Sequence, residues 1–288
     1  MKALYIGRFE PPHDGHLGSM LRALERHDRL HLLLGSANLA RSSKNPWSAA
    51  ERARLIRRSL TDGGVDPRRV RCSPLPDEFD ALRWAAQVRR LAGRTVPVLV
   101  GFEKDASSSY LRWFPDWPAD PSPLAPGLNA TEIRAAYFEG RAVPGVPPAV
   151  GKFLERWKAS ATYTRLRAEH LAVQAARRAW NGQPQREVLT VDVNAGQVRL
   201  ARRTQPIGRG LWALPSTALP PGRDPPPQAQ VFDHPARSLA VPTTAYAVQG
   251  EAGSGEWVPL EAALRQPRRF FEDHHVILRR MLERLRLG

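Results

Sequence analysis

The stretch that decides the fold lies near the start of the chain and comprises residues 2–27, KALYIGRFEPPHDGHLGSMLRALERH. The apolar run over residues 2–7 predicts a buried strand, and apolar residues at helical spacing from Leu17 to Leu24 predict a helix over residues 15–27. A strand that passes through a short glycine-containing loop into a helix is typical of α/β proteins, which bind ligands at this junction. We therefore expect a ligand site where the first strand meets the first helix.

The same alternation of strand and helix continues along the first two thirds of the chain. Further strands are predicted over residues 30–36, 70–73 and 95–101, and further helices over residues 49–60, 81–91, 129–140, 148–158 and onward to residue 180. Alternating elements of this kind imply a parallel sheet that is covered by helices on both faces. The first domain, residues 1–182, is thus predicted to be a doubly wound α/β domain.

A second and smaller domain is expected over residues 183–288. After the helix-ending segment Asn181-Gly182-Gln183-Pro184 the pattern changes, and residues 188–193 and 198–201 read as a hairpin. A proline-rich loop over residues 219–230, a strand over residues 243–249 and a helix over residues 274–287 follow. We expect an α+β fold for this part.

Composition excludes several classes of protein. The 288 residues are 42% hydrophobic and 25% charged, which is typical of a folded globular protein. Cys72 is the only cysteine, so a disulfide framework or a cysteine zinc cluster within one chain is excluded. No apolar run approaches the roughly 20 residues of a membrane span, and the first residues lack a secretory signal, so we expect a cytoplasmic protein without a membrane partner.

The net charge of +15 indicates anionic ligands. Nucleic acid is not expected as the main partner, because the excess positive charge is scattered arginine without a lysine-rich tail or an aromatic RNA-binding motif. Small phosphorylated substrates account for the charge equally well. The oligomeric state is left open, and a homo-oligomer is compatible with the sequence.

The loop after the first strand has the features of a phosphate site. Residues 7–16 read GRFEPPHDGH, in which Gly7 and Gly15 permit close approach of a ligand to the backbone. His13 and His16 lie three residues apart at the start of the helix, where both imidazoles can donate to one phosphate chain. The pair predicts a nucleotide-phosphate site.

This segment resembles the nucleotidylyltransferase superfamily, whose motif is of the type Gly-x-Phe-x-Pro-x-His-x-Gly-His. A second family motif, at the start of a late helix, resembles residues 129–134, NATEIR, with Asn129 where serine is usual. The resemblance implies that His13 and His16 bind the ATP phosphates and that Thr131 and Arg134 hold the outgoing pyrophosphate. The catalytic residues are then His16, His13 and Arg134, and the implied ATP site comprises Gly7, Arg8, Phe9, His13, Gly15, His16, Lys44, Asn129, Thr131 and Arg134.

Two further segments narrow the resemblance. Residues 44–52, KNPWSAAER, are similar to a segment of nicotinamide-mononucleotide (NMN) adenylyltransferases, and residues 100–115, VGFEKDASSSYLRWFP, resemble bacterial enzymes that fuse this transferase to a Nudix hydrolase. A flat, cationic nicotinamide ring requires an aromatic face for stacking. We assign this role to Trp84, with Phe9, Trp47 and Trp113 as alternatives.

The second domain resembles a Nudix domain that lacks its catalytic centre. Residues 208–215, GRGLWALP, and 231–238, VFDHPARS, are similar to Nudix segments, but the glutamate-rich Nudix box is missing between them. The 15 residues from Ser216 to Gln230 contain one carboxylate, Asp224, and many prolines, so neither the helix nor the metal cluster can form. We expect a degenerate Nudix-like domain, inactive as a hydrolase, that serves packing, dimerisation or nucleotide sensing.

The predicted reaction joins ATP and NMN to give NAD and pyrophosphate, with Mg²⁺ as cofactor. Nucleotidyl transfer requires alignment and positive charge and no nucleophilic side chain, because the acceptor phosphate itself attacks the α-phosphate in line. Two alternatives are a nucleotidylyltransferase with another phosphorylated acceptor and a regulatory pseudoenzyme that senses NAD or ADP-ribose. The preference between nicotinamide and nicotinic acid mononucleotide is left open.

Overall fold

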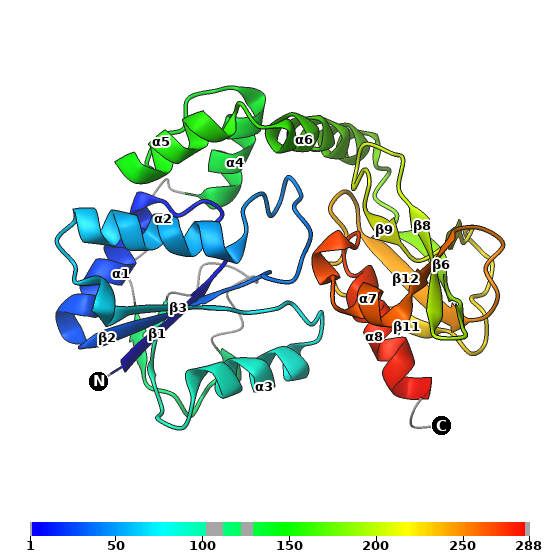
Figure 1. Cartoon of the computed structure of the whole chain (residues 1–288), viewed down its shortest axis with the longest axis horizontal. Helices are drawn as coiled ribbons and strands as arrows, with labels where there is room; N and C mark the ends of the chain where they lie inside the picture. The colour runs from blue at the N-terminus through cyan, green and yellow to red at the C-terminus, as the bar shows by residue number, and fades with distance from the viewer. Residues whose placement is uncertain (1, 102–111, 122–128, 286–288) are drawn as a thin grey trace. The chain divides into compact units, whose positions relative to one another are not determined.

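The computed structural model describes residues 2–101, 112–121 and 129–285, and it divides the chain into two compact units (Figure 1). The first unit comprises residues 1–37 and 43–167, and the second comprises residues 38–42 and 168–288. Among the described helices, none is both long and apolar enough to span a membrane.

The division falls inside helix α6 (Ala161–Ala179), earlier than the predicted limit after residue 182. Contacts along the helix explain the difference. Its first part belongs to the first unit, where Arg167 donates to the carbonyl of Phe138. Its last part belongs to the second unit, where the Glu169 carboxylate accepts from the backbone N–H of Gly208 at 2.9 Å. Periodicity shows where a helix ends, and it does not show which core each turn contacts.

The first unit contains the expected doubly wound parallel sheet. The strand order is β3-β2-β1-β4-β5, and every pairing in it is parallel. The strands are β1 (Lys2–Gly7), β2 (Arg29–Leu34), β3 (Val70–Pro74), β4 (Val98–Gly101) and β5 (Ala119–Pro121). The helices that follow them are α1 (Asp14–Arg26), α2 (Ala49–Asp62), α3 (Ala81–Ala92), α4 (Ala130–Glu139), α5 (Pro148–Trp157) and α6. The order changes direction between β1 and β4, which is the position where such sheets bind ligands.

Both faces of this sheet are buried by helices (Figure 1). Ala3 and Tyr5 of β1 pack in the core that α1 and α2 complete, whereas Leu4 and Ile6 pack on the opposite face with α3. Successive side chains of a strand point to opposite faces, so an unbroken apolar strand requires cover on both sides. The predicted layering is confirmed.

Capping side chains fix the first residues of α2 and α3, and so fix where the loops that leave the carboxyl ends of the strands come to an end. Helix α2 begins with a capping box, in which the N–H of Glu51 donates to Oγ of Ser48 at 3.2 Å and the N–H of Ser48 donates to Oε2 of Glu51 at 2.7 Å. Asp80 caps α3 by accepting from the N–H of Arg83 at 2.9 Å. These helices therefore start at defined residues beside the carboxyl ends of the strands.

The second unit has the predicted α+β composition. One sheet has the order β10-β6-β12-β11 and the other β13-β8-β7, with β9 paired to β8. Its strands are β6 (Gln185–Val191), β7 (Val193–Asn194), β8 (Gln197–Arg202), β9 (Trp212–Ala213), β10 (Ser216–Ala218), β11 (Gln230–Phe232), β12 (Thr243–Gln249) and β13 (Glu256–Pro259). Its own helices are α7 (Leu260–Leu264) and α8 (His274–Leu285).

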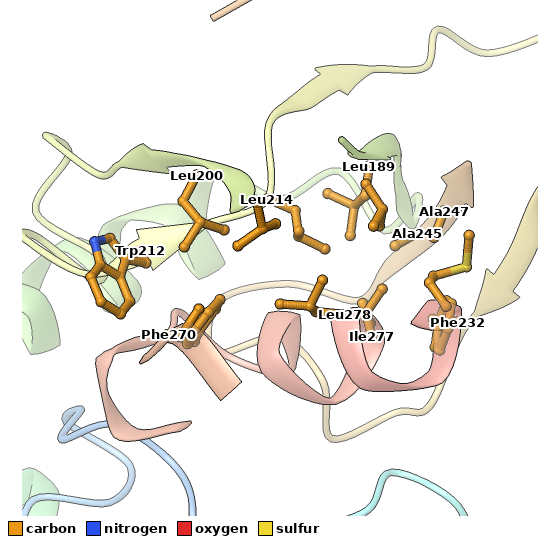
Figure 2. Packing of buried hydrophobic residues seen from close by; sticks show 14 of the residues in the cluster. Leu189, Leu200, Trp212, Leu214, Phe232, Ala245, Ala247, Phe270, Ile277 and Leu278 are labelled. Atoms are coloured by element: carbon orange, nitrogen blue, oxygen red, sulfur yellow. The ribbon is translucent and has the colours of Figure 1, made fainter. Parts of the chain in front are cut away.

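The second unit has a hydrophobic core of its own. Figure 2 shows Ile277 and Leu278 of α8 pointing toward Leu189 of β6 and Leu214, with Trp212 and Phe270 at one end. The rings of Trp212 and Phe270 meet edge to face, with centroids 5.6 Å apart. A core of this kind is what an independently folding domain requires.

Candidate active site

The β1–α1 loop, residues 8–13, lies at the carboxyl end of β1 and is shaped by Phe9. The Phe9 ring is buried beneath Gly7, where an added Cβ would lie 2.8 Å from Cζ of the ring. The ring also meets His16 edge to face, with centroids 4.9 Å apart. Gly7 is therefore required because the Phe9 ring occupies the space of any side chain, and Phe9 in turn supports His16.

His13 and His16 form a stacked pair at the N-terminus of α1. Their ring centroids are 3.6 Å apart with an interplanar angle of 26°, and the N–H of His13 donates to Nδ1 of His16 at 3.4 Å. An Nδ1 that accepts leaves Nε2 to carry the proton of a neutral imidazole. His16 is therefore arranged as an Nε2 donor at the end of a helix whose dipole attracts anions.

Arg134 extends from α4 to the β1–α1 loop. Its guanidinium donates to the carbonyl of Glu10 at 2.6 Å and to Oγ1 of Thr131 at 3.1 Å. Burial, followed by the neighbouring charge of Arg8, lowers its pKa to about 9, so it remains a cation at neutral pH. The structure thus brings together the two motifs that stand far apart in the sequence.

Asn129 acts as the N-cap of α4. Its Oδ1 accepts from the N–H of Thr131 at 2.9 Å, which is the function that a serine would perform at this position. The replacement of serine by asparagine therefore preserves the helix start and leaves Thr131 exposed beside Arg134.

Arg8 is positioned by a residue that sequence reasoning did not single out. Its guanidinium donates to Oδ1 of Asn45 at 3.4 Å, and Asn45 is buried. The half-buried Lys44 precedes Asn45 in the segment that enters α2. The segment was recognised as a motif, and only contact geometry identifies Asn45 as its link to the β1–α1 loop.

A buried ion pair between Glu10 and Arg52 was also missed. Nε of Arg52 lies 3.1 Å from Oε1 of Glu10, and each side chain is 1% exposed. Burial raises the pKa of the Glu10 carboxyl to about 7, against the opposing effects of Arg52 and then Arg134. Both residues belong to the quoted motifs, but nothing in their spacing indicates that they pair.

The aromatic candidates differ in their accessibility. Trp84 on α3 is half-buried, and its ring centroid lies 6.2 Å from that of Phe114. Trp47 is 2% exposed and Phe9 is 1% exposed, so the structure places both alternatives in the core rather than on an open surface. Trp47 packs there with Tyr137 and Trp157, because the segment before α2 turns its apolar side toward α4 and α5.

Trp84 lies near the start of α3, which follows β3, and the carboxyl ends of parallel strands share one edge of the sheet. Trp113 is 40% exposed. Most of the predicted family segment at residues 100–115, namely residues 102–111, lies outside the described residues.

The donor set of this site suits phosphates and not a resident metal. Arg8, Lys44, His13, His16 and Arg134 are cations or N–H donors, and the carboxylate of Glu10 is paired with Arg52. Across residues 2–101, 112–121 and 129–285, no group of three or more His, Cys, Asp and Glu side chains could hold a metal ion.

The region where a Nudix box would stand is fully described and holds no catalytic helix. Residues 216–230 contain β10, a loop and the start of β11, and Asp224 is exposed on the loop. The predicted absence of a helix in this stretch is confirmed.

Comparison with known proteins identifies relatives of part of the chain. Residues 4–71 match the cytidylyltransferase-like family model. A nicotinamide/nicotinic acid mononucleotide adenylyltransferase from Acinetobacter baylyi is 31% identical over 176 residues, which cover 59% of this chain and 93% of that protein. A nicotinamide-nucleotide adenylyltransferase from Ignicoccus hospitalis is 45% identical over 89 residues, which cover 31% of this chain and 52% of that relative.

The whole chain also has a structural counterpart. A bifunctional NMN adenylyltransferase/ADP ribose pyrophosphatase from Francisella tularensis, complexed with AMP and a manganese ion, superposes with a TM-score of 0.88 and covers 98% of both chains. Its sequence is 24% identical, so this likeness shows the fold of both units.

Proposed function

The chain belongs to the nicotinamide/nicotinic acid mononucleotide adenylyltransferase family, and from this membership we propose that it transfers the adenylyl group of ATP to NMN, giving NAD and pyrophosphate. The observation that carries the proposal is that the stacked pair His13 and His16 and the guanidinium of Arg134 all meet the β1–α1 loop or the helix start that follows it. We also propose a cytoplasmic location for the reaction.

The proposed chemistry needs alignment and positive charge. A phosphate oxygen of NMN attacks the α-phosphorus of ATP, and the bond from that phosphorus to the β-bridging oxygen breaks in line. His16 donates through Nε2 to the phosphate that gains charge, while His13 and Arg134 hold the departing pyrophosphate. Mg²⁺ would be part of the ATP substrate, and it would supply positive charge to the phosphates that these side chains hold.

The neighbouring residues would complete the ATP site. Arg8 and Lys44 bring positive charge to the phosphates, and the helix that Asn129 caps presents backbone N–H groups beside Thr131. The buried Phe9 ring acts through His16 and not by stacking on a substrate.

A panel of substrates tests the proposal against the nearest alternative. The purified protein, with Mg²⁺, is assayed with ATP or CTP and with NMN, nicotinic acid mononucleotide or 4′-phosphopantetheine. We expect a dinucleotide from ATP and at least one of the two pyridine mononucleotides. A product formed only with CTP or only with phosphopantetheine would support another acceptor and contradict the proposal.

Replacing Trp84 by alanine should raise KM for the mononucleotide about tenfold and leave KM for ATP within about twofold. Stacking of a cationic ring on a partly desolvated indole contributes about 1–2 kcal/mol, which corresponds to this range. Steady-state kinetics with each substrate varied in turn provide the measurement. Trp180, which is 39% exposed and lies after α6, supplies the control substitution to alanine. If KM for ATP and KM for the mononucleotide rise equally in Trp84→Ala, the result would indicate a packing role for Trp84.

For the second unit we propose a Nudix-like domain without hydrolase activity. The support is the likeness of the whole chain to the bifunctional fold together with the loop at residues 216–230. The alternative of a regulatory pseudoenzyme that senses NAD or ADP-ribose predicts binding of those ligands without any dinucleotide synthesis, so the substrate panel separates it from the transferase.

A further inference from the structure

Glu10 is a negative charge in a site that otherwise gathers cations. Its carboxylate is 1% exposed, and the charges that act on it are those of Arg52, Arg134 and Arg8. A buried carboxylate beside a triphosphate site carries a desolvation cost and repels the phosphates. A neutral side chain would avoid both effects, so the presence of a carboxylate at this position needs a physical reason.

The contacts of Glu10 provide this reason, because they join the segments that carry the proposed phosphate-binding residues. Its carboxylate pairs with Arg52 of α2 and accepts from the N–H of Trp47 at 3.2 Å. Its main-chain carbonyl accepts from Arg134 of α4. One residue thus connects the β1–α1 loop to the segment before α2, to α2 and to α4.

Arg52 extends the network to two further carbonyls. Its Nη1 donates to the carbonyl of Arg8 and, at 2.9 Å, to that of Gly35, which follows β2. Arg52 is itself 1% exposed, so the carboxylate of Glu10 offsets part of the cost of burying its positive charge. The pair therefore holds the backbone at the carboxyl ends of β1 and β2 in one arrangement.

We propose that Glu10 is a positioning residue for adenylyl transfer, which through Arg52 and Arg134 holds the β1–α1 loop in the geometry that places His13 and His16 on the ATP phosphates. The inference rests on the proposed function. A site whose donors are held before the substrate arrives spends less binding free energy on ordering them. None of these contacts involves Trp84, so ATP and not the mononucleotide should respond to loss of the carboxylate.

The ionisation of Glu10 gives this role a pH signature. Burial raises its pKa to about 7, and the groups that face it are Arg52, Arg134, Arg8 and the N–H of Trp47. Below that pH the carboxyl gains a proton and no longer neutralises Arg52. The wild-type kcat/KM for ATP should then fall more steeply between about pH 8 and pH 6 than that of Glu10→Gln, in which no carboxyl group is present to gain the proton.

The central experiment compares Glu10→Gln with a matched substitution in the other unit. Asp273 and Arg237 form an ion pair in the second unit that is also 1% exposed on both sides, and Asp273→Asn removes an equally buried carboxylate. We expect Glu10→Gln to lower kcat/KM for ATP at least about tenfold and to leave KM for the mononucleotide within about threefold. Glu10→Asp should restore part of the loss, and Asp273→Asn should leave the ATP parameters within about twofold.

Two results would overturn the inference. One is an active Glu10→Gln protein whose kcat/KM for ATP lies within twofold of wild type. The other is a Glu10→Gln protein in which KM for ATP and KM for the mononucleotide rise by the same factor. If Glu10→Gln does not fold, Arg52→Lys keeps the positive charge and loses the guanidinium donors, and it should show the same selective loss for ATP.

Failure of the proposed function is recognised separately. A wild-type protein that makes no dinucleotide would contradict the transferase proposal, and calorimetric binding of MgATP, which needs no turnover, would then test Glu10. An affinity at least about fivefold weaker in Glu10→Gln would support the positioning role, and an unchanged affinity would refute it.

Discussion

Replacing His16 by alanine should lower kcat for dinucleotide synthesis by about 100-fold or more. Its Nδ1 accepts from the backbone of His13, so its Nε2 is left as the donor, in the first turn of α1 at the positive end of the helix. A donor that meets charge developing in the transition state contributes more to turnover than to ground-state binding. The measurement is initial velocity at saturating ATP and NMN, with circular dichroism to confirm the folded state.

The control for this variant is His234→Ala. His234 is an exposed histidine of the second unit, so its loss should leave kcat unchanged. His16→Asn retains an N–H donor of shorter reach and should lie between wild type and alanine. Turnover of His16→Ala within twofold of wild type would remove His16 from the mechanism.

The second large effect is an absence: the protein should release no AMP from ADP-ribose above the rate of a blank, with either Mg²⁺ or Mn²⁺. Hydrolysis of the Nudix type depends on a cation that neutralises the pyrophosphate and activates water, and several carboxylates on one rigid helix must hold it. Residues 216–230 form β10, a loop and the start of β11 instead, and Asp224 is their single carboxylate. Among the residues that the structure describes, other carboxylates do not assemble into a metal-binding group.

The full-length His16→Ala protein is the suitable sample for this assay, because the transferase chemistry that could also consume nucleotides is weakened in it. AMP release is followed by chromatography over a range of metal concentrations. Binding of ADP-ribose without turnover would be compatible with the account. Metal-dependent hydrolysis that disappears in Asp224→Asn would show that the region was misinterpreted.

The sequence predicted the first unit well where the pattern was long and apolar. Strand β1 was predicted with its observed limits, and the order of strands and helices followed from strict alternation. The short edge strand β5 (Ala119–Pro121) was missed, because three residues with an aspartate and a proline carry no period-2 apolar signal. Strand β4 begins at Val98, directly after Pro97, three residues later than predicted.

The second unit shows the limit of periodicity more clearly. A single strand was predicted over residues 188–193, whereas the structure separates β6 from β7 at Asp192. The Asp192 side chain pairs with Arg199 at 3.0 Å and accepts from the N–H of Ala252 at 2.9 Å. The contact with Ala252 comes from a part of the chain 60 residues away, and a local pattern does not contain it.

The sequence motifs predicted which residues belong to the candidate site, but they did not predict the contacts among those residues. Histidine spacing and the two motif segments identified His13, His16 and Arg134, which the structure brings to one loop. The pair of Glu10 with Arg52 joins residues that lie far apart in sequence, so neither spacing nor composition indicates it. Trp47 was considered for stacking because it lies in the acceptor motif, and only three-dimensional packing places its ring in the core.

The most direct test of the central claim follows the phosphates of ATP. The wild-type protein is incubated with NMN, Mg²⁺ and ATP carrying a radioactive label on either the α- or the γ-phosphate. Adenylyl transfer predicts that the α label appears in NAD and the γ label in pyrophosphate, in equal amounts. Formation of ADP or of a γ-labelled acceptor, or no labelled NAD with either mononucleotide, would contradict the account.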